Sequence, residues 1–343
     1  MQSGCSKGLF SVIVPTYNRK KLLLRALDSV KHQTYRPIEV VVVDDGSTDG
    51  TAEAVQDWKR NACSDGQLDL KYIYQDNQGA PVARNRALQE SQGEFIQYLD
   101  SDDELYKTGL ADAFEMFRKY PEYDCIHSGF DRVCGQCGQV LDSYTPRSMN
   151  NALEGYMKGA LWGNTCDFAE RRSFVMRVGP WDEELIVAQD LDYTHRRLLL
   201  ARNVGFLARR QFVCYRGAAS QISDHRYTRD GWAIRLMIEE RFVDALSRRD
   251  DIDQEARRVY AEKLYYIAVR VSGEGAPDIG RRYGELAERV YCLPLSSGGK
   301  RMRLLWRGGK TVCRMWGFGR KVRRWIRQRR GLVKPPHVCG TIN

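Results

Sequence analysis

The chain has 343 residues, 43% of them hydrophobic and 29% charged, with a formal net charge of +10. These values are ordinary for a globular protein, and the length allows a full core in one or two domains. No apolar run approaches the roughly 20 residues that span a bilayer, and the first residues lack a cationic start followed by an apolar block. We therefore expect neither an integral membrane protein nor a secreted one.

The charge is distributed unevenly along the chain. After Glu288 there are 15 Lys and Arg residues and no acidic residue, whereas the preceding residues carry 39 basic and 44 acidic side chains. An acidic body with a cationic tail points to an anionic surface as the partner of the tail. The ten cysteines are expected to be reduced thiols of a cytosolic protein, with Cys134 and Cys137 flanking a hairpin turn.

The first part of the chain alternates between strand-like and helix-like stretches. Apolar, β-branched runs predict strands at 10–15, 38–43, 70–74 and 94–99, and periodic apolar residues predict helices between them at 20–32, up to Trp58, and at 81–92. Strands and helices that alternate with short connections form a parallel α/β sheet with right-handed crossovers. In such sheets ligands bind beyond the carboxyl ends of the strands.

Polar residues follow several of these predicted strands at the point where each one ends. The clusters are Thr16 and Tyr17, Asp44 and Asp45, and Asp100, Asp102 and Asp103. Because the strands are predicted to be parallel, we expect all three clusters on one rim of the sheet.

The most acidic of these clusters lies in Leu99-Asp-Ser-Asp-Asp103. Carboxylates packed this tightly repel one another, and burying them is costly unless a cation lies among them. Hard oxygen ligands suit Mg²⁺ or Mn²⁺, which keep open positions for phosphate oxygens. A solvated acidic turn is the alternative. The chain has no glycine-rich phosphate loop, so a cation and basic side chains would have to hold any phosphates.

For each of three further residues of the rim we consider a ligand-binding role and a structural alternative. Asp45 can accept a hydrogen bond from a nucleobase, or it can cap a turn. Tyr17 offers a ring on which a base can pack, or it belongs to the core. Arg84, early in a predicted helix, can reach a diphosphate, or it can pair with a carboxylate.

Four stretches resemble, in order, the motifs of the family 2 glycosyltransferases, which have the GT-A fold. They are Val14–Arg19, Val43–Gly50, Ala83–Asn85 and Leu99–Asp103. The resemblance covers roughly the first two thirds of the chain. It implies a Rossmann-like, mostly parallel sheet with flanking helices. It also implies transfer of a glycosyl unit from a nucleoside-diphosphate sugar, expected to be a UDP-sugar, with inversion. A divalent metal, Mn²⁺ or Mg²⁺, would be the cofactor.

The resemblance also assigns residues to the donor site. The implied donor-binding residues are Pro15, Thr16, Tyr17, Asp45, Arg84 and Asp100. The first three would line the base pocket, Asp45 would read the base, and Asp100 would lie near the ribose or the sugar. Asp102 is the leading metal ligand, and Asp103 is the second choice because the motif here has an extra aspartate.

The part of the chain after residue 107 is expected to shape the acceptor site. The residues expected on the acceptor side are Trp162, Gly163, Asn164, Trp181 and Glu183. In the family a general base lies in an acidic pair before a helix, and here Gln189 stands first in that pair. This leaves Asp190 as the catalytic base, with Glu183 as the alternative, while a helix N-cap is the non-catalytic interpretation of Asp190.

The remaining chain is predicted to be helical at 229–249, 254–271 and 278–292, where it packs on the catalytic domain or on another copy. The predicted domains are 1–228, with a nucleotide-sugar half at 1–106 and an acceptor half at 107–228, a helical extension at 229–299 and a basic tail at 300–343. Arg and Lys interleaved with tryptophans between 300 and 330 suit an anionic membrane surface. Nucleic-acid binding and a solvated tail are the alternatives.

We expect a non-processive enzyme, because Gln-x-x-Arg-Trp of the processive synthases is absent and Lys321 stands where its Gln would be. The expected acceptor is a lipid-linked or cell-surface glycan precursor, reached from the cytoplasm at the inner face of the membrane, and a homo-oligomer is possible. A His that often follows the Tyr215-Arg216 pair in the family is replaced by Gly217, with His225 further on. The rival interpretations are a nucleotidyltransferase that makes nucleotide sugars and a nucleic-acid-binding protein without catalysis; we expect no nucleic acid.

Overall fold

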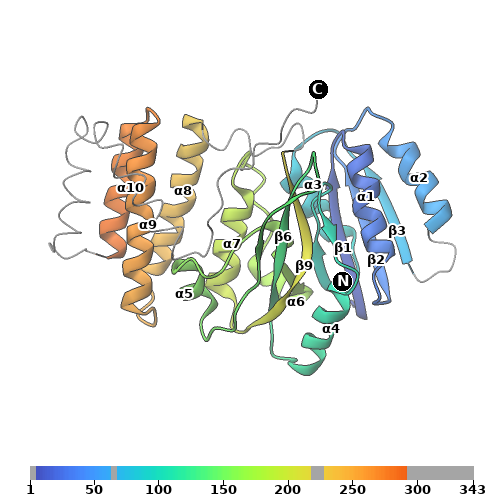
Figure 1. The fold of residues 1–343 in the computed structure, drawn as a ribbon, viewed down its shortest axis with the longest axis horizontal. Coiled ribbons are helices and arrows are strands. Elements are labelled where there is room, and N and C mark those ends of the chain that lie inside the picture. The colour runs from blue at the N-terminus through green and yellow to red at the C-terminus, as the bar shows by residue number, and fades with distance from the viewer. Residues whose placement is uncertain (1–4, 63–67, 218–227, 292–343) are drawn as a thin grey trace. The chain divides into compact units, whose positions relative to one another are not determined.

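The computed structural model describes residues 5–62, 68–217 and 228–291 (Figure 1). The chain divides into two compact units. Among the described residues, the first unit holds 5–149 and 163–217, and the second holds 150–162 and 228–291. The predicted basic tail and His225 lie outside the described residues.

Four parallel strands begin the sheet of the first unit. They are β1 (Ser6–Thr16), β2 (Ile38–Asp44), β3 (Leu68–Tyr74) and β4 (Gly93–Tyr98), in the order β3-β2-β1-β4. The connecting helices are α1 (Lys20–Lys31), α2 (Thr51–Ala62) and α3 (Ala80–Glu90). Right-handed crossovers place α1 and α2 on one face and α3 on the other, because the chain reverses its direction across the sheet after β3 (Figure 1).

The register of these strands brings their carboxyl ends level. Thr16 pairs with Asp44, and Asp44 pairs with Tyr74, while Ile13 pairs with Tyr98 on the other side of β1. β2 is apolar because it is covered on both faces: Val40, Val41, Val42 and Val43 are all fully buried. The predicted rim therefore exists as one edge of the sheet.

The sheet continues with five strands from the part of the chain after the acidic turn. β8 (Phe168–Arg171) is antiparallel to β4 and to β6 (Cys125–Cys134), and β9 (Val204–Arg216) runs parallel to β6. β5 (Glu104–Leu105) pairs with β9, and β7 (Val140–Tyr144) pairs with β6 across the turn that begins at Cys134. Since β5 begins directly after Asp103, its pairing draws the end of β9 to the acidic turn.

The remaining helices of the first unit are α4 (Gly109–Lys119), η1 (Thr165–Asp167), α6 (Arg172–Val178) and α7 (Gln189–Leu200). α6 packs on β4, β8 and α7. The fold class predicted from the sequence, a mostly parallel α/β sheet with flanking helices, is confirmed. The short elements β5, β8, η1 and α6 were not predicted.

The second unit is helical. It consists of α5 (Ala152–Met157), α8 (Arg229–Leu246), α9 (Gln254–Gly273) and α10 (Pro277–Val290). The last three lie close to the predicted helices, and α5 was not predicted. Thr228 caps α8, Asp253 caps α9, and a proline opens α10. Among the described helices of both units, none combines the length and the hydropathy needed to cross a bilayer.

Candidate active site

The loops after β1 and β2 are tied together at the strand ends. The main-chain N–H of Asn18 donates to Ser47 Oγ at 2.8 Å, and Thr48 N–H donates to Asn18 Oδ1 at 2.8 Å. Asn18 has a φ of 49°, a left-handed conformation that asparagine tolerates better than most residues. Beside this junction Tyr17 is 49% exposed, so its ring is available to a ligand, whereas Thr16 is buried.

Asp44 and Asp45 organise the loops of the rim. Asp44 accepts from Ser47 N–H at 2.9 Å and from the Tyr72 hydroxyl at 2.5 Å. Asp45 is buried, and it accepts from the Gln75 side chain at 2.7 Å and from Gly79 N–H at 2.7 Å. These bonds fix the loop that leads into α3. Asp45 therefore stabilises a turn, as its structural alternative predicted. Recognition of a nucleobase by Asp45 stays a prediction.

The acidic turn follows β4. Asp100 is partly exposed, Asp102 pairs with Arg19 at 3.2 Å, and Asp103 is buried. Asp103 accepts from Tyr215 N–H at 3.2 Å, a contact that the pairing of β5 with β9 produces. Arg25 on α1 also holds the turn, because its guanidinium donates to the carbonyl oxygen of Asp102 at 2.7 Å.

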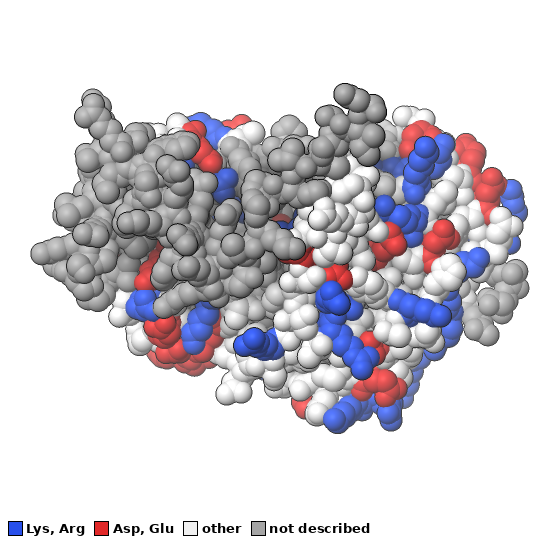
Figure 2. Space-filling model, viewed as in Figure 1, with Lys and Arg blue, Asp and Glu red and all other residues white. Residues whose placement is uncertain are grey.

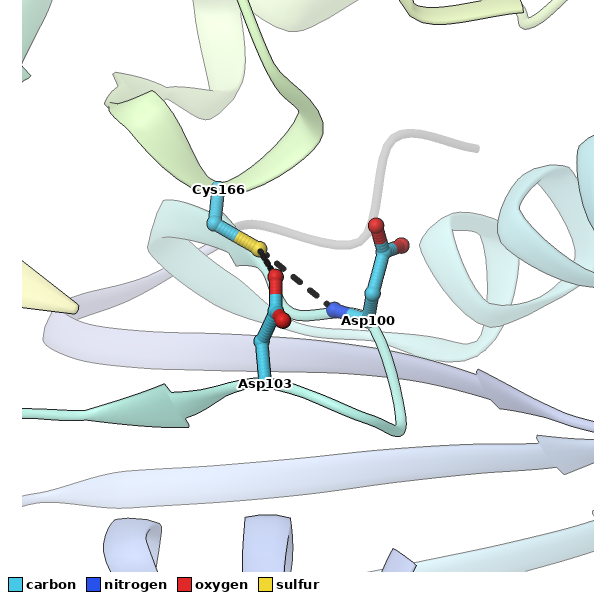
Figure 3. Close-up of side chains that lie close together, drawn as sticks. All are labelled: Asp100, Asp103 and Cys166. Atoms are coloured by element: carbon cyan, nitrogen blue, oxygen red, sulfur yellow. Dashed lines mark hydrogen bonds between the residues drawn. The ribbon is translucent and has the colours of Figure 1, made fainter. Parts of the chain in front are cut away.

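A thiol completes this cluster. The Sγ of Cys166, on η1, lies 3.7 Å from an oxygen of Asp103 and 3.5 Å from the main-chain nitrogen of Asp100 (Figure 3). One donor atom from each of the three residues lies within 4.8 Å of the others. The runner-up ligand Asp103 belongs to this convergent group, whereas the leading candidate Asp102 turns to Arg19.

Burial and mutual repulsion raise the pKa values of two carboxylates in the acidic turn, Asp102 and Asp103. Burial raises the pKa of Asp103 well above its usual range, and the neighbouring carboxylates of Asp102 and Asp100 raise it further. The pKa of Asp102 is also raised by burial, although Arg19 opposes the shift. Burial lowers the pKa of the Arg216 guanidinium, but the acidic groups around it outweigh burial and raise it. These carboxylates therefore carry charge at a cost that a nearby cation would reduce.

The residues present fit a divalent cation. One oxygen from each of two carboxylates and one thiol sulfur lie within 4.8 Å of one another, and the charge of the third carboxylate of the turn, Asp102, also acts on Asp103. Oxygen donors suit Mg²⁺ and Mn²⁺, and a sulfur donor widens the range of ions. Which of these residues would ligate the ion stays a prediction.

Arg84 links the acidic turn to α7. Its guanidinium, buried on α3, donates to Asp100 Oδ1 at 2.8 Å and to the Gln189 side-chain oxygen at 3.0 Å. The predicted alternative, a pair with a carboxylate, is therefore present. Because one guanidinium bonds both side chains, the start of α7 lies next to the acidic turn, and Asp190 is the following residue.

An aromatic platform supports Arg84. Its guanidinium carbon lies 4.5 Å from the ring centre of Trp181, which stacks on Tyr193 of α7 at 4.1 Å. Asn85, the next residue on α3, exchanges two hydrogen bonds with the main chain of Trp181, at 2.8 and 2.9 Å. The Ala83-Arg-Asn85 motif thus joins α3 to the segment before α7.

α7 begins in an unusual conformation. Ala188 precedes it with a φ of 59°, in the left-handed region, so Gln189 is the first helical residue and Asp190 lies in the first turn. Asp190 is not the N-cap residue of the helix, although its Oδ1 accepts from Leu191 N–H at 2.9 Å within the first turn. A non-glycine residue held in this region stores about 1–3 kcal/mol, and such strain often occurs at functional sites.

The predicted acceptor-side residues have different surroundings. Gly163 packs against α7, where a Cβ would lie 2.7 Å from Thr194 Oγ1, and Asn164 forms a capping box with Asp167. Glu183 is exposed and accepts from Asn85 at 2.8 Å. Trp162 is a half-buried residue of the helical unit. Trp181 is 2% exposed, so an effect on an acceptor would pass through its neighbours.

Sequence reasoning assigned no role to Arg19, Cys166 or Arg216. Arg19 was inside a quoted motif that follows a predicted strand, and Arg216 is the last residue of β9, so position at a strand end is the signal that both share. Cys166 gave no local signal, because the short η1 and the antiparallel β8 bring it to the site.

The model of glycosyl transferase family 2 matches residues 11–178, which run from the middle of β1 through the acidic turn to the end of α6. Residues 11–178 belong to glycosyl transferase family 2. The match ends before α7, so the family 2 model itself does not reach Asp190.

Proteins with known names or structures give the same family and fold. The chain is 35% identical over 161 residues to TuaG of Bacillus subtilis, named for teichuronic acid biosynthesis, which covers 45% of this chain and 61% of TuaG. It spans 30 to 61% of the length of the first relatives matched. The structure of S. aureus TarS 1–349 with UDP-GlcNAc has a TM-score of 0.68 and 24% identity, covering 96% of this chain and 94% of that one.

A second solved structure shares the fold at lower similarity. It is the mannosyltransferase PcManGT from Pyrobaculum calidifontis with GDP-Man and Mn²⁺, with a TM-score of 0.51 and 21% identity, covering 94% of this chain and 84% of that one. The family 2 chain therefore has the GT-A fold, as its strand-end motifs predicted.

Proposed function

We propose that this family 2 protein transfers a sugar from a nucleoside-diphosphate sugar to a hydroxyl acceptor, with inversion at the anomeric carbon. The observation that carries the proposal is the bridge made by Arg84, which bonds both Asp100 on the acidic turn and Gln189 at the start of α7. Through this bridge the charged groups of the acidic turn lie next to the first turn of α7, which holds Asp190. A single displacement requires a base this close to the donor.

The donor would lie along the rim with its base near Tyr17 and its diphosphate at the acidic turn. UDP is the nucleotide we infer, since the TarS structure of the same fold contains UDP-GlcNAc. Arg84, Arg216 and Arg19 supply positive charge around the turn for an anionic group. Pro15, Thr16 and Asp45 remain the proposed residues of the base pocket.

A divalent cation held by the acidic turn would neutralise charge on the departing diphosphate. The structure of PcManGT contains Mn²⁺ with its nucleotide sugar, which supports an ion of this kind. Asp103 and Asp100 are the donors that the geometry favours, with Asp102 as a further carboxylate held by Arg19.

Asp190 is the proposed general base. It would accept the proton of the acceptor hydroxyl while that oxygen bonds to the anomeric carbon and the bond to the diphosphate breaks. One displacement of this kind inverts the anomeric configuration. Glu183 is the alternative base, but its hydrogen bond to Asn85 ties it to α3.

The acceptor is proposed to be a glycan precursor, lipid-linked or at the cell surface, in a non-processive reaction. The likeness to a protein named for teichuronic acid biosynthesis supports a role in building a glycan. Membrane attachment through residues 300–330, a cytoplasmic location and a homo-oligomer remain predictions.

The test combines donor screening with two matched substitutions. The full chain is incubated with a panel of nucleotide sugars and Mn²⁺, and released UDP or GDP is measured, with calorimetry for binding. Asp190→Asn should abolish transfer and keep donor affinity, whereas Asp102→Asn should also weaken Mn²⁺-dependent donor binding. Full activity in purified, folded Asp190→Asn would overturn the assignment of the base. Absence of nucleotide-sugar binding by the unmodified chain would overturn the function.

A further inference from the structure

The side chain of Cys166 faces the same point as the carboxylates of the acidic turn. Its Sγ lies 3.7 Å from Asp103 Oδ2, and Figure 3 shows the thiol directed at that carboxylate from η1. The three donor atoms, from Asp100, Asp103 and Cys166, lie within 4.8 Å of one another. Two hard oxygens and one soft sulfur thus share one site.

The position of this sulfur is fixed by its own short helix. Asn164 and Asp167 form a reciprocal capping box around η1, with Asn164 N–H donating to Asp167 at 2.8 Å. The carbonyl oxygen of Cys166 accepts from the Gln97 side chain on β4 at 3.1 Å. Cys166 is 3% exposed, so the thiol is held beside the turn rather than free to rotate into solvent.

We propose that Cys166 is a thiolate ligand of the cation at the acidic turn, and that it gives the site a preference for Co²⁺, Zn²⁺ and Cd²⁺ over Mg²⁺. This inference rests on the proposed function, because it adds a donor to the inferred metal site. The thiol proton is released to water when the metal–sulfur bond forms, and Asp100 and Asp103 each supply an oxygen. Thiolates select these softer ions, whereas carboxylates alone suit Mg²⁺.

The chain offers a matched control for this cysteine. Cys125 on β6 is a fully buried free thiol outside the convergent group. Cys125→Ser therefore removes a buried thiol without removing the proposed sulfur ligand. Cys166→Ser and Cys166→Ala remove that ligand with two different side chains.

The experiment titrates the reduced full chain with Co²⁺ and records the thiolate-to-cobalt charge-transfer band in the near ultraviolet. The unmodified chain and Cys125→Ser should develop the band, and both Cys166 variants should lack it. In Cys166→Ser the Cd²⁺ affinity should fall about tenfold or more, because loss of even an outer-shell partner costs that much, while Mn²⁺ affinity changes less. A band of equal intensity in folded Cys166→Ala, or no band in the unmodified chain that binds Co²⁺, would overturn the proposal.

Two readouts keep the result interpretable. If both Cys166 variants fail to fold, the ¹¹³Cd resonance of the unmodified chain decides, since a sulfur ligand moves it far from the oxygen-only region. Mn²⁺-dependent UDP binding is measured on the same preparations. Its presence without a cobalt band overturns the role of Cys166 alone, whereas its absence overturns the proposed function.

Discussion

Arg84 makes contacts that a bound diphosphate would have to share or replace. Its guanidinium spans Asp100 and Gln189 over the face of Trp181, and it is 6% exposed. A planar fork can bond two acceptors at once, which an ammonium group cannot do with the same geometry. Arg84 thus offers a positive charge to the proposed donor and, through its hydrogen bond to Gln189, holds the start of α7.

We predict that Arg84→Lys weakens UDP binding about tenfold, equivalent to about 1.4 kcal/mol, and that Arg84→Gln weakens it more. The physical reason is the loss of the fork in the first variant and of the charge in the second. Isothermal titration with UDP and Mn²⁺ measures the effect. Arg118→Lys is the control, because Arg118 is exposed and pairs only with Glu115 among the described residues. An unchanged Kd for Arg84→Gln would contradict the prediction.

At the scale of single residues, the sequence predicts the location of side chains that directly follow parallel strands. Asp44, Asp45 and the acidic turn were located by that rule alone, because the carboxyl ends of parallel strands share an edge. The neighbours of these residues were not predictable in the same way. Cys166 and Tyr215 reach the turn through strand pairs that join distant parts of the chain.

At the scale of elements, a buried ion pair anchors α7 to the sheet. Arg197 on α7 bonds Glu170 on β8 through two contacts of 2.9 and 3.1 Å, and the two side chains are 1% and 0% exposed. Burial raises the pKa of Glu170, and Arg197 opposes that shift. The pair fixes the helix whose first turn holds Asp190.

We predict that Arg197→Met lowers the free energy of unfolding by about 3–5 kcal/mol, because Glu170 is left buried without its partner. Urea unfolding measures the change. The double variant Glu170→Leu with Arg197→Met should recover most of the loss, since it removes both charges. If the single variant were as stable as the unmodified chain, the pair would have no anchoring role.

A second buried carboxylate should make stability depend on pH. Burial alone would raise the pKa of Asp131 on β6, but hydrogen bonds from Ser143, Tyr106 and Arg210 outweigh burial and lower it. A lowered pKa in the folded state means that Asp131 stabilises the protein above the unfolded pKa of about 3.9, and that this contribution is lost as the pH falls further.

We therefore predict that Asp131→Asn lowers stability at neutral pH by about 1–3 kcal/mol, and that its difference from the unmodified chain shrinks below about pH 4. Thermal unfolding of both proteins across this pH range provides the measurement. A difference that stayed constant from neutral to acidic pH would show that the carboxylate charge of Asp131 is not the stabilising feature.

Sequence periodicity predicts the long elements and misses the short ones. β2 and α1 have enough buried apolar positions to show their period, whereas β5 has two residues and β8 has four. Such short strands are stabilised by their partners in the sheet, so their own residues carry little signal.

At the scale of the whole molecule, charged side chains of both signs lie on the face of the described residues that Figure 2 draws. Figure 2 shows basic and acidic side chains interspersed on the face drawn, in keeping with surface pairs such as Arg177 with Asp124. The sequence places its excess of positive charge after Glu288, and the described part of the chain ends at residue 291. The described units therefore belong to the part of the chain in which acidic residues outnumber basic ones.

The helical unit depends on close packing of α9 and α10. A Cβ at Gly280 would lie 2.6 Å from the carbonyl oxygen of Ala268 and closer still to the Ser272 hydroxyl. We predict that Gly280→Ala destabilises the protein by about 1–3 kcal/mol through overpacking, while Mn²⁺-dependent UDP affinity stays unchanged. Gly273→Ala is the control, because its added Cβ would meet no heavy atom within 4 Å apart from its chain neighbours and the backbone of its own helix. Thermal unfolding compares the two, and equal stability would contradict the close-packing assignment.

The most direct test of the donor site is a crystal of the full chain grown with UDP and Mn²⁺. We predict a manganese anomalous peak at the carboxylates of Asp103 and Asp100, with the diphosphate between that ion and Arg84. A crystal in which UDP was bound elsewhere and the acidic turn held no ion would contradict the proposed function.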